Sequence, residues 1–149
     1  MSHRKPSRVK IRRFDSQDST AVLQLANGLI PESEGAQRAT MLKNVLRDPN
    51  YSLYVAEVEE RIAGFIDLRI FPDFVEGIPL ALIQNVVVQR PFRRQGIGSK
   101  LLHRVISDAV QRKVGEIHVW TEFENQQAIT FYIQHGFQKR GIVLEKENK

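Results

Sequence analysis

The stretch from residue 86 to 102, VVVQRPFRRQGIGSKLL, joins an apolar run, the adjacent arginines Arg93 and Arg94 and two glycines to the start of a helical pattern. A helix N-terminus presents unpaired N–H groups and a partial positive charge. Two glycines let the backbone approach a ligand, and Arg93 and Arg94 add cationic donors. The pattern predicts a phosphorylated ligand across residues 93 to 99. If the two glycines are considered by themselves, the alternative interpretation is a tight strand-to-helix turn that binds no ligand.

Two common phosphate-binding loops do not fit this stretch. The dinucleotide fingerprint needs a third glycine where Leu101 stands, and it follows an early strand that is missing here. The Walker A loop places Lys directly after its second glycine, whereas here Ser99 precedes Lys100. The remaining pattern is Arg93-x-x-Gly96-x-Gly98 between a strand and a helix.

A second motif lies about 30 residues further on, in a short helical segment. Its members are Asn125, Ala128, Phe131, Tyr132, Gly136 and Phe137. Together with RRQGIG, it makes the segment from about 80 to 138 resemble the core of the GCN5-related N-acetyltransferase (GNAT) superfamily. Residues 1 to 79 match this superfamily only in the order of their predicted strands and helices.

The resemblance implies acetyl-CoA as co-substrate. Its pantetheine would pair with the backbones of Val86, Val87 and Val88, and Asn125 would touch it near the later helix. The pyrophosphate would be held by Arg93, Arg94, Gln95, Gly96, Ile97, Gly98 and Ser99.

The resemblance also implies direct acetyl transfer to an amine, with Tyr132 as the acid that protonates the departing thiolate; packing in the core is the alternative role for Tyr132. Several relatives carry a glutamate where this chain has Gln84, whose amide cannot accept a proton at neutral pH. Water, or one of Glu76, Glu122 and Glu124, would then take the proton of the amine, unless the acceptor has a low amine pKa. Gln84 and Asn85 are expected to orient the acceptor or to be satisfied internally at a strand irregularity.

The expected acceptor is the primary amine of a small molecule. A protein amine is an alternative, as is a CoA-binding regulatory module without catalysis. The acceptor site is expected near the loop PDFVEGIP, where Asp73 and Glu76 are candidates to attract an ammonium group, and near the first two helices. Trp120 and Phe123 are expected in the core or at its rim.

Composition limits the class of protein. The chain has 149 residues, 42% of them hydrophobic, and no cysteine, which suits one globular domain over 9–149 without thiolate chemistry. No apolar segment approaches the roughly 20 residues that span a bilayer, so a cytoplasmic protein is expected. The four histidines are scattered and predict no metal site. A homodimer is left open.

The net charge of +5 belongs mainly to the N-terminus. Residues 1 to 13 contain six Lys/Arg and no acid, which leaves 16 basic against 17 acidic residues elsewhere. A flexible basic arm over 1–8 is therefore predicted, and nucleic-acid binding is not.

The periodicity predicts a mixed α/β (α+β) domain in the order β-αα-ββ-β-α-β-α-ββ, with a mostly antiparallel sheet and helices on both faces. Strands are predicted at 9–14, 53–58, 62–71, 80–88 and 116–120. Two more are predicted within FQKR and IVLEK. Helices are predicted after Asp15 up to Pro31, around Ala39–Leu46, after the glycine loop with Gly115 as C-cap, and over 125–135.

Overall fold

The computed structural model describes residues 8–29 and 35–148. It divides into a first unit that ends at His118 and a second that begins at Val119. The strands are β1 Val9–Arg13, β2 Tyr51–Val58, β3 Arg61–Asp73, β4 Ile78–Ile83, β5 Val86–Val88 and β6 Glu116–Val119. The helices are α1 Ser19–Leu29, α2 Gly35–Leu46, α3 Ile97–Gln111 and α4 Gln126–Gln134, with 3-10 turns η1 Ser16–Asp18 and η2 Arg90–Phe92. The predicted arm over 1–8, apart from Arg8, and the helix end at Pro31 lie outside the described residues.

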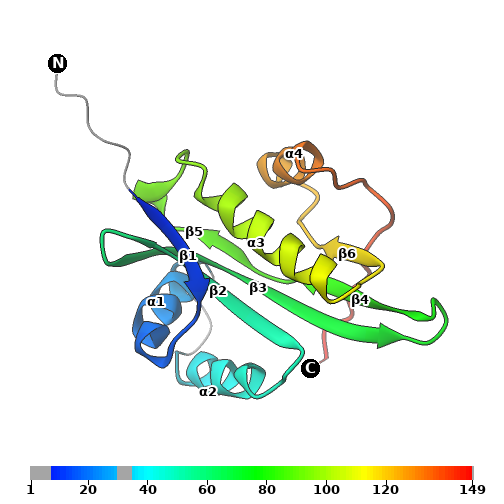
Figure 1. Cartoon of the computed structure of the whole chain (residues 1–149), viewed down its shortest axis with the longest axis horizontal. Coiled ribbons are helices and arrows are strands. Elements are labelled where there is room, and N and C mark those ends of the chain that lie inside the picture. Colours follow the sequence, from blue (N-terminus) through cyan, green and yellow to red (C-terminus); the bar gives the residue numbers. More distant parts are fainter. Residues whose placement is uncertain (1–7, 30–34, 149) are drawn as a thin grey trace. The chain divides into compact units, whose positions relative to one another are not determined.

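The strands form one sheet in the order β1-β2-β3-β4-β6, and β5 pairs with β3 beyond the end of β4. The pairs β1–β2, β2–β3, β3–β4 and β3–β5 are antiparallel. Figure 1 shows α1 and α2 on one side of these strands and α3 on the other. The predicted mostly antiparallel sheet with helices on both faces is therefore confirmed.

Successive side chains of β2 and β3 point to opposite faces of the sheet, so both strands present apolar side chains to the helices on either side. Leu53, Val55 and Phe65 form a buried cluster with Val22 of α1. On the opposite face, residues such as Tyr54 and Ile66 are fully buried, and α3 contributes Leu101, Leu102 and Val105. Each such side chain stabilises the fold by about 1.5–3 kcal/mol relative to exposure.

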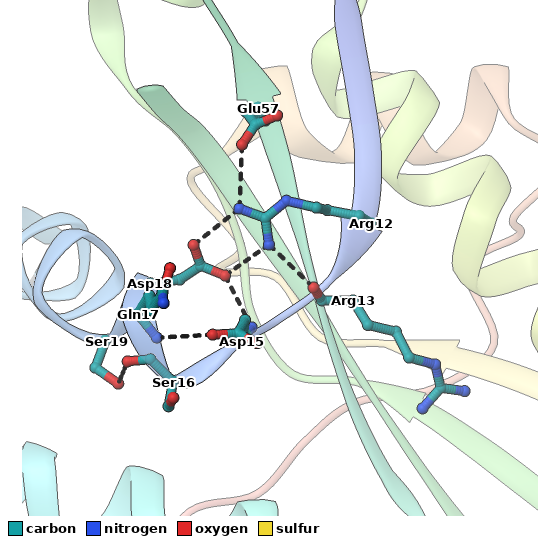
Figure 2. A network of polar contacts seen from close by, with 8 residues as sticks. All are labelled: Arg12, Arg13, Asp15, Ser16, Gln17, Asp18, Ser19 and Glu57. Carbon is teal, nitrogen blue, oxygen red and sulfur yellow. Dashed lines mark hydrogen bonds and ion pairs between the residues drawn. The ribbon is translucent and has the colours of Figure 1, made fainter. Parts of the chain in front are cut away.

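An ion-pair network fixes the start of α1 against the sheet (Figure 2). The Arg12 guanidinium on β1 donates to both carboxylate oxygens of Asp18, over 2.8 and 2.9 Å, and to Glu57 of β2 over 3.2 Å. Asp18 also accepts the backbone N–H of Asp15, which caps η1. The hydrogen bonds from Arg12, followed by that from Asp15, lower the pKa of Asp18, although burial opposes them.

The predicted strand 80–88 is wrong as one element, because the chain breaks between β4 and β5 at Gln84 and Asn85. The register of β4 places residue 84 opposite Asp67, and the register of β5 places Asn85 opposite the same residue. Two residues therefore oppose one, which is a β-bulge.

The predicted loop 72–79 is shorter in the structure, because β3 reaches Asp73 and β4 begins at Ile78. Pro72 and Pro79 face each other in register. This position alternates with the hydrogen-bonded pairs of the ladder, so neither proline needs an N–H there. Pro72 and Pro79 therefore lie within strands, although their presence in the sequence indicated a loop.

The two strands predicted after α4 are absent from the described part of the second unit. Ile142, Val143 and Leu144 are all exposed. A strand needs a neighbouring backbone to bond, and alternation alone does not provide one. Gly115 is also not the C-cap of α3, which ends at Gln111 with Arg112 as its C-cap; instead the Gly115 N–H donates to Pro79 O of β4 over 2.8 Å.

Candidate active site

A cavity of about 450 Å³ lies between helices α1 and α2 and one face of β2 and β3. Most of its described wall is apolar and comes from the inner sides of both helices. Its polar side chains are Arg38, Tyr51, Asp67, Arg69, Gln84 and Asn85. The first two helices thus contribute to the cavity as expected for an acceptor site, whereas the segment 72–79 contributes no wall residue.

The floor of the cavity includes three alternate residues of β3, Phe65, Asp67 and Arg69. Side chains two apart on a strand point to the same face, so these three form a row under α1 and α2. Tyr51 stands opposite Arg69 on β2. The order of residues along β3 therefore places an aromatic ring, a carboxylate and a guanidinium one after another on the floor of the cavity.

Asp67 is buried, with 2% of its surface exposed, and its carboxylate holds the bulge together. One oxygen accepts the backbone N–H groups of Gln84 and Asn85 over 3.0 and 2.9 Å. The other accepts the Asn85 side-chain amide and the Tyr51 hydroxyl, both over 2.8 Å. A carboxylate has about four acceptor positions, and all four are used.

Tyr51 is the other titratable group on this floor. Burial raises the pKa of its hydroxyl well above the usual range, and the negative charge of Asp67 raises it further. The hydroxyl therefore stays protonated at neutral pH and donates to Asp67. The Arg69 guanidinium lies over the Tyr51 ring, 5.8 Å from its centre.

The bulge sets the direction of the backbone groups in β5. Gln89 N–H bonds Ala63 O over 2.7 Å, and Asp67 N–H bonds Asn85 O over 3.2 Å. Hydrogen-bonded positions alternate in an antiparallel ladder, so Val87, midway between them, also faces β3. Its two neighbours in β5 therefore direct their backbone groups away from β3.

Those neighbours, Val86 and Val88, lie on a strand that pairs with β3 alone among the described elements. The carbonyl of Val88 accepts Arg93 Nε over 3.0 Å. Both backbone groups of Val86 and the N–H of Val88 remain directed outward. An extended ligand with amide groups, such as a pantetheine arm, fits such an edge.

The glycine loop leads from β5 into α3. Arg94 and Gly96 both have left-handed backbone conformations, with φ of +64° and +75°, and Gly96 is the N-cap. Gly96 has no side chain to cap the first N–H groups of α3, and the binding of an anion there stays a prediction. Ile97 is 1% exposed, so its side chain belongs to the core and only its backbone is available to a ligand.

Two predicted site residues lie in the second unit. Asn125 caps α4 and its side-chain oxygen accepts Ala128 N–H over 3.1 Å. Tyr132 is 9% exposed and has edge contacts with Phe131 and Phe137, with ring centres 5.2 and 5.5 Å apart. Their roles toward acetyl-CoA stay predictions.

Sequence reasoning missed Asp67 and Arg69. The signal was present in GFIDLRIF, where two charged residues interrupt an apolar strand on one face. Glu76, an earlier candidate base, donates its backbone N–H to Asp73 in the turn before β4 and is not part of the cavity wall. Trp120 and Phe123 are exposed rather than in a core.

Within residues 8–29 and 35–148, no group of three His, Cys, Asp or Glu gathers as a metal would require. None of the helices in the same part of the chain is long and apolar enough to cross a membrane.

The acetyltransferase (GNAT) family matches this chain over residues 19–137. An uncharacterized N-acetyltransferase of Methanocaldococcus jannaschii is 32% identical over 92 residues, which are 60% of this chain and 40% of that protein. The chain thus spans less than half of that relative. The aminoglycoside N(6')-acetyltransferase type 1 of Serratia marcescens is 22% identical, over 83% of this chain and 87% of its own.

Among solved structures, an aminoglycoside N-acetyltransferase in complex with CoA superimposes with a TM-score of 0.86 and 20% identity. The superposition covers 97% of each chain. At this identity, the likeness shows a common fold.

Proposed function

Because this chain belongs to the acetyltransferase (GNAT) family, we propose that it transfers an acetyl group from acetyl-CoA to the primary amine of a small molecule. The observation that supports this proposal most directly is the position of the β5 edge. It follows directly after Gln84 and Asn85, which line the cavity, and precedes the glycine loop. One continuous stretch thus joins an acceptor cavity to a phosphate-binding helix start.

In this proposal, the outward backbone groups of Val86 and Val88 bind the pantetheine amides. The first N–H groups of α3, with Arg94, bind the pyrophosphate. Arg93 stiffens the turn through its bond to Val88 O. Co-substrate and acceptor then meet at the bulge.

The chemistry is a direct transfer. The neutral amine nitrogen forms a bond to the thioester carbonyl carbon, the carbon–sulfur bond breaks, and the thiolate leaves and takes up a proton. The Val86 N–H is directed outward and is available to stabilise the oxyanion. The amine proton passes to water, because Gln84 cannot accept it and Asp67 already accepts four hydrogen bonds.

The test is thiol release from acetyl-CoA by the purified chain with a panel of primary amines, and mass spectrometry of the products. We expect at least one small amine to gain an acetyl group. Tight acetyl-CoA binding without turnover on any amine favours a CoA-binding module. Acetylation of peptides alone favours a protein amine as acceptor.

A further inference from the structure

We propose that the acceptor is an amino carboxylate with an apolar body, bound with its carboxylate on Arg69 and its amine at the bulge. This inference rests on the proposed function and narrows its substrate class. It concerns the cavity of the first unit, whose charges and apolar surface are set by described residues.

Arg69 has no counter-ion among the described residues. Its Nε is buried and has no hydrogen-bond partner, and none of the ion pairs in the described part of the chain includes it. The guanidinium lies over the face of the Tyr51 ring. A half-buried guanidinium with an unused N–H is well suited to a carboxylate, which it binds through paired hydrogen bonds.

Arg38 of α2 adds a second cation to the opposite wall, where it donates to the side-chain oxygen of Asn27. Asp67 is the only carboxylate among the described wall residues, and its four acceptor positions are already used. Among the described residues, the wall therefore has two guanidinium groups and no carboxylate that is available to an ammonium group. A polycationic acceptor would be repelled here, whereas an anionic group is attracted.

The remaining residues of the cavity wall are apolar and therefore favour an acceptor molecule with an apolar body. Val22 and Ala26 of α1, Leu42 of α2, and Leu53 and Phe65 of the sheet line the same cavity as Arg69 and the bulge. Polar hydroxyl groups of a sugar would lose their hydrogen bonds to water against this surface.

The two ends are separated by a distance that a small molecule can span. Ile66 stands opposite Val86, and Arg69 is three residues further along β3. Three strand residues correspond to about 10 Å. An extended ω-amino acid, with one hydrogen bond at each end, spans a gap of this size, so its carboxylate reaches Arg69 when its amine lies at the bulge.

The experiment compares matched acceptors that differ at one end. The ω-amino acids from β-alanine to aminohexanoate are tested with their carboxamides and with diamines of equal length. We expect kcat/KM to favour the carboxylate over its carboxamide by about tenfold to a hundredfold, the usual scale of a charged hydrogen bond. Arg69→Gln should abolish this ratio, and Arg69→Glu should reverse it toward diamines. Arg61→Gln, on the same strand but outside this cavity, is the control and should keep the ratio.

A binding measurement separates this inference from the proposed function. Carboxylate and carboxamide members are titrated calorimetrically into the protein saturated with CoA, so that no chemistry occurs. Tighter binding of the carboxylate that is lost in Arg69→Gln supports the inference even if no amine is acetylated. Equal binding and equal turnover of carboxylate, carboxamide and diamine would overturn it, while acetyl transfer itself would still stand.

Discussion

Asn85 is bound to Asp67 twice, through its backbone N–H over 2.9 Å and through its side-chain amide over 2.8 Å. Gln84 shares the first of these oxygens. Asp67 therefore holds the extra residue of the bulge, which decides that Val86 and Val88, and not Val87, face the open edge of β5.

Removing that carboxylate should damage both stability and co-substrate binding. Asp67→Ala leaves two backbone N–H groups, one side-chain amide and the Tyr51 hydroxyl without their acceptor, so we expect a loss of about 2–5 kcal/mol in the free energy of unfolding. The CoA affinity should also fall, because the bulge no longer fixes the register of β5 and therefore which of its backbone groups face the open edge. Urea unfolding and CoA titration measure the two effects. Unchanged CoA affinity in a folded variant would contradict the role given to the bulge.

Gly64 permits the close approach of β3 to β5. A Cβ at this position would lie 2.4 Å from the carbonyl oxygen of Val87. Gly64→Ala should therefore push the strands apart, cost about 1–3 kcal/mol in the free energy of unfolding and weaken acetyl-CoA binding. Gly28→Ala is the matched control, since nothing lies within 4 Å of that position in α1. The control should be neutral or stabilising by up to about 1 kcal/mol. Equal behaviour of the two variants in urea unfolding would count against this explanation.

Tyr132→Phe tests the proposed acid for the thiolate. We expect turnover to fall about tenfold to a hundredfold, at or below the lower end of the usual contribution of general acid catalysis, because water can replace part of the proton transfer. Tyr54→Phe is the control, because Tyr54 is fully buried and its hydroxyl has no partner among the described residues. Steady-state thiol release measures both variants. If the two lose turnover alike, or neither does, Tyr132 is not the acid.

The pH profile should reflect the substrate rather than the cavity. The described wall has no His, Cys, Lys or Glu, and the pKa of Tyr51 is raised by burial and by Asp67. The logarithm of kcat/KM should therefore rise with unit slope from about pH 6 toward the pKa of the amine, as neutral amine accumulates. Acceptors of different amine pKa, assayed in parallel, should shift the profile accordingly. A plateau common to all of them near pH 7 would indicate a protein base.

Asp18 should contribute to stability in a pH-dependent manner. Because Arg12 lowers its pKa in the folded chain, its contribution is present above the ordinary aspartate pKa of about 4 and is lost as the pH falls through the folded value. Asp18→Asn should cost about 1–3 kcal/mol at pH 7 and less at pH 3. Glu57→Gln, at the more exposed end of the network, should cost less than about 1 kcal/mol. Thermal unfolding from pH 3 to pH 7 measures these differences, and a pH-independent loss would exclude the ion pair as the cause.

The helices and the hairpin could be predicted from sequence because their signals are local. Asp15 caps the turn before α1, and apolar spacing identifies the buried stripe of α3. A strand irregularity at Gln84 and Asn85 was one of the two expectations for these residues, but its cause was not predictable, since the run LALIQNVVV satisfies a buried strand and the carboxylate that holds the bulge lies on β3. The final two strands were predicted from alternation, which does not show whether a partner strand exists.

The sequence by itself determined the family, through RRQGIG and the motif from Asn125 to Phe137, because backbone approach and helix starts depend on residue type at short spacing. Tertiary structure decided which backbone groups of β5 face outward, because that direction depends on a buried carboxylate 17 residues before Gln84. It also decided the charge of the cavity. Arg38 of α2 is separated from Asp67 and Arg69 of β3 by the whole of β2 in the chain, and only the packing of α2 over the sheet makes the three side chains walls of one site.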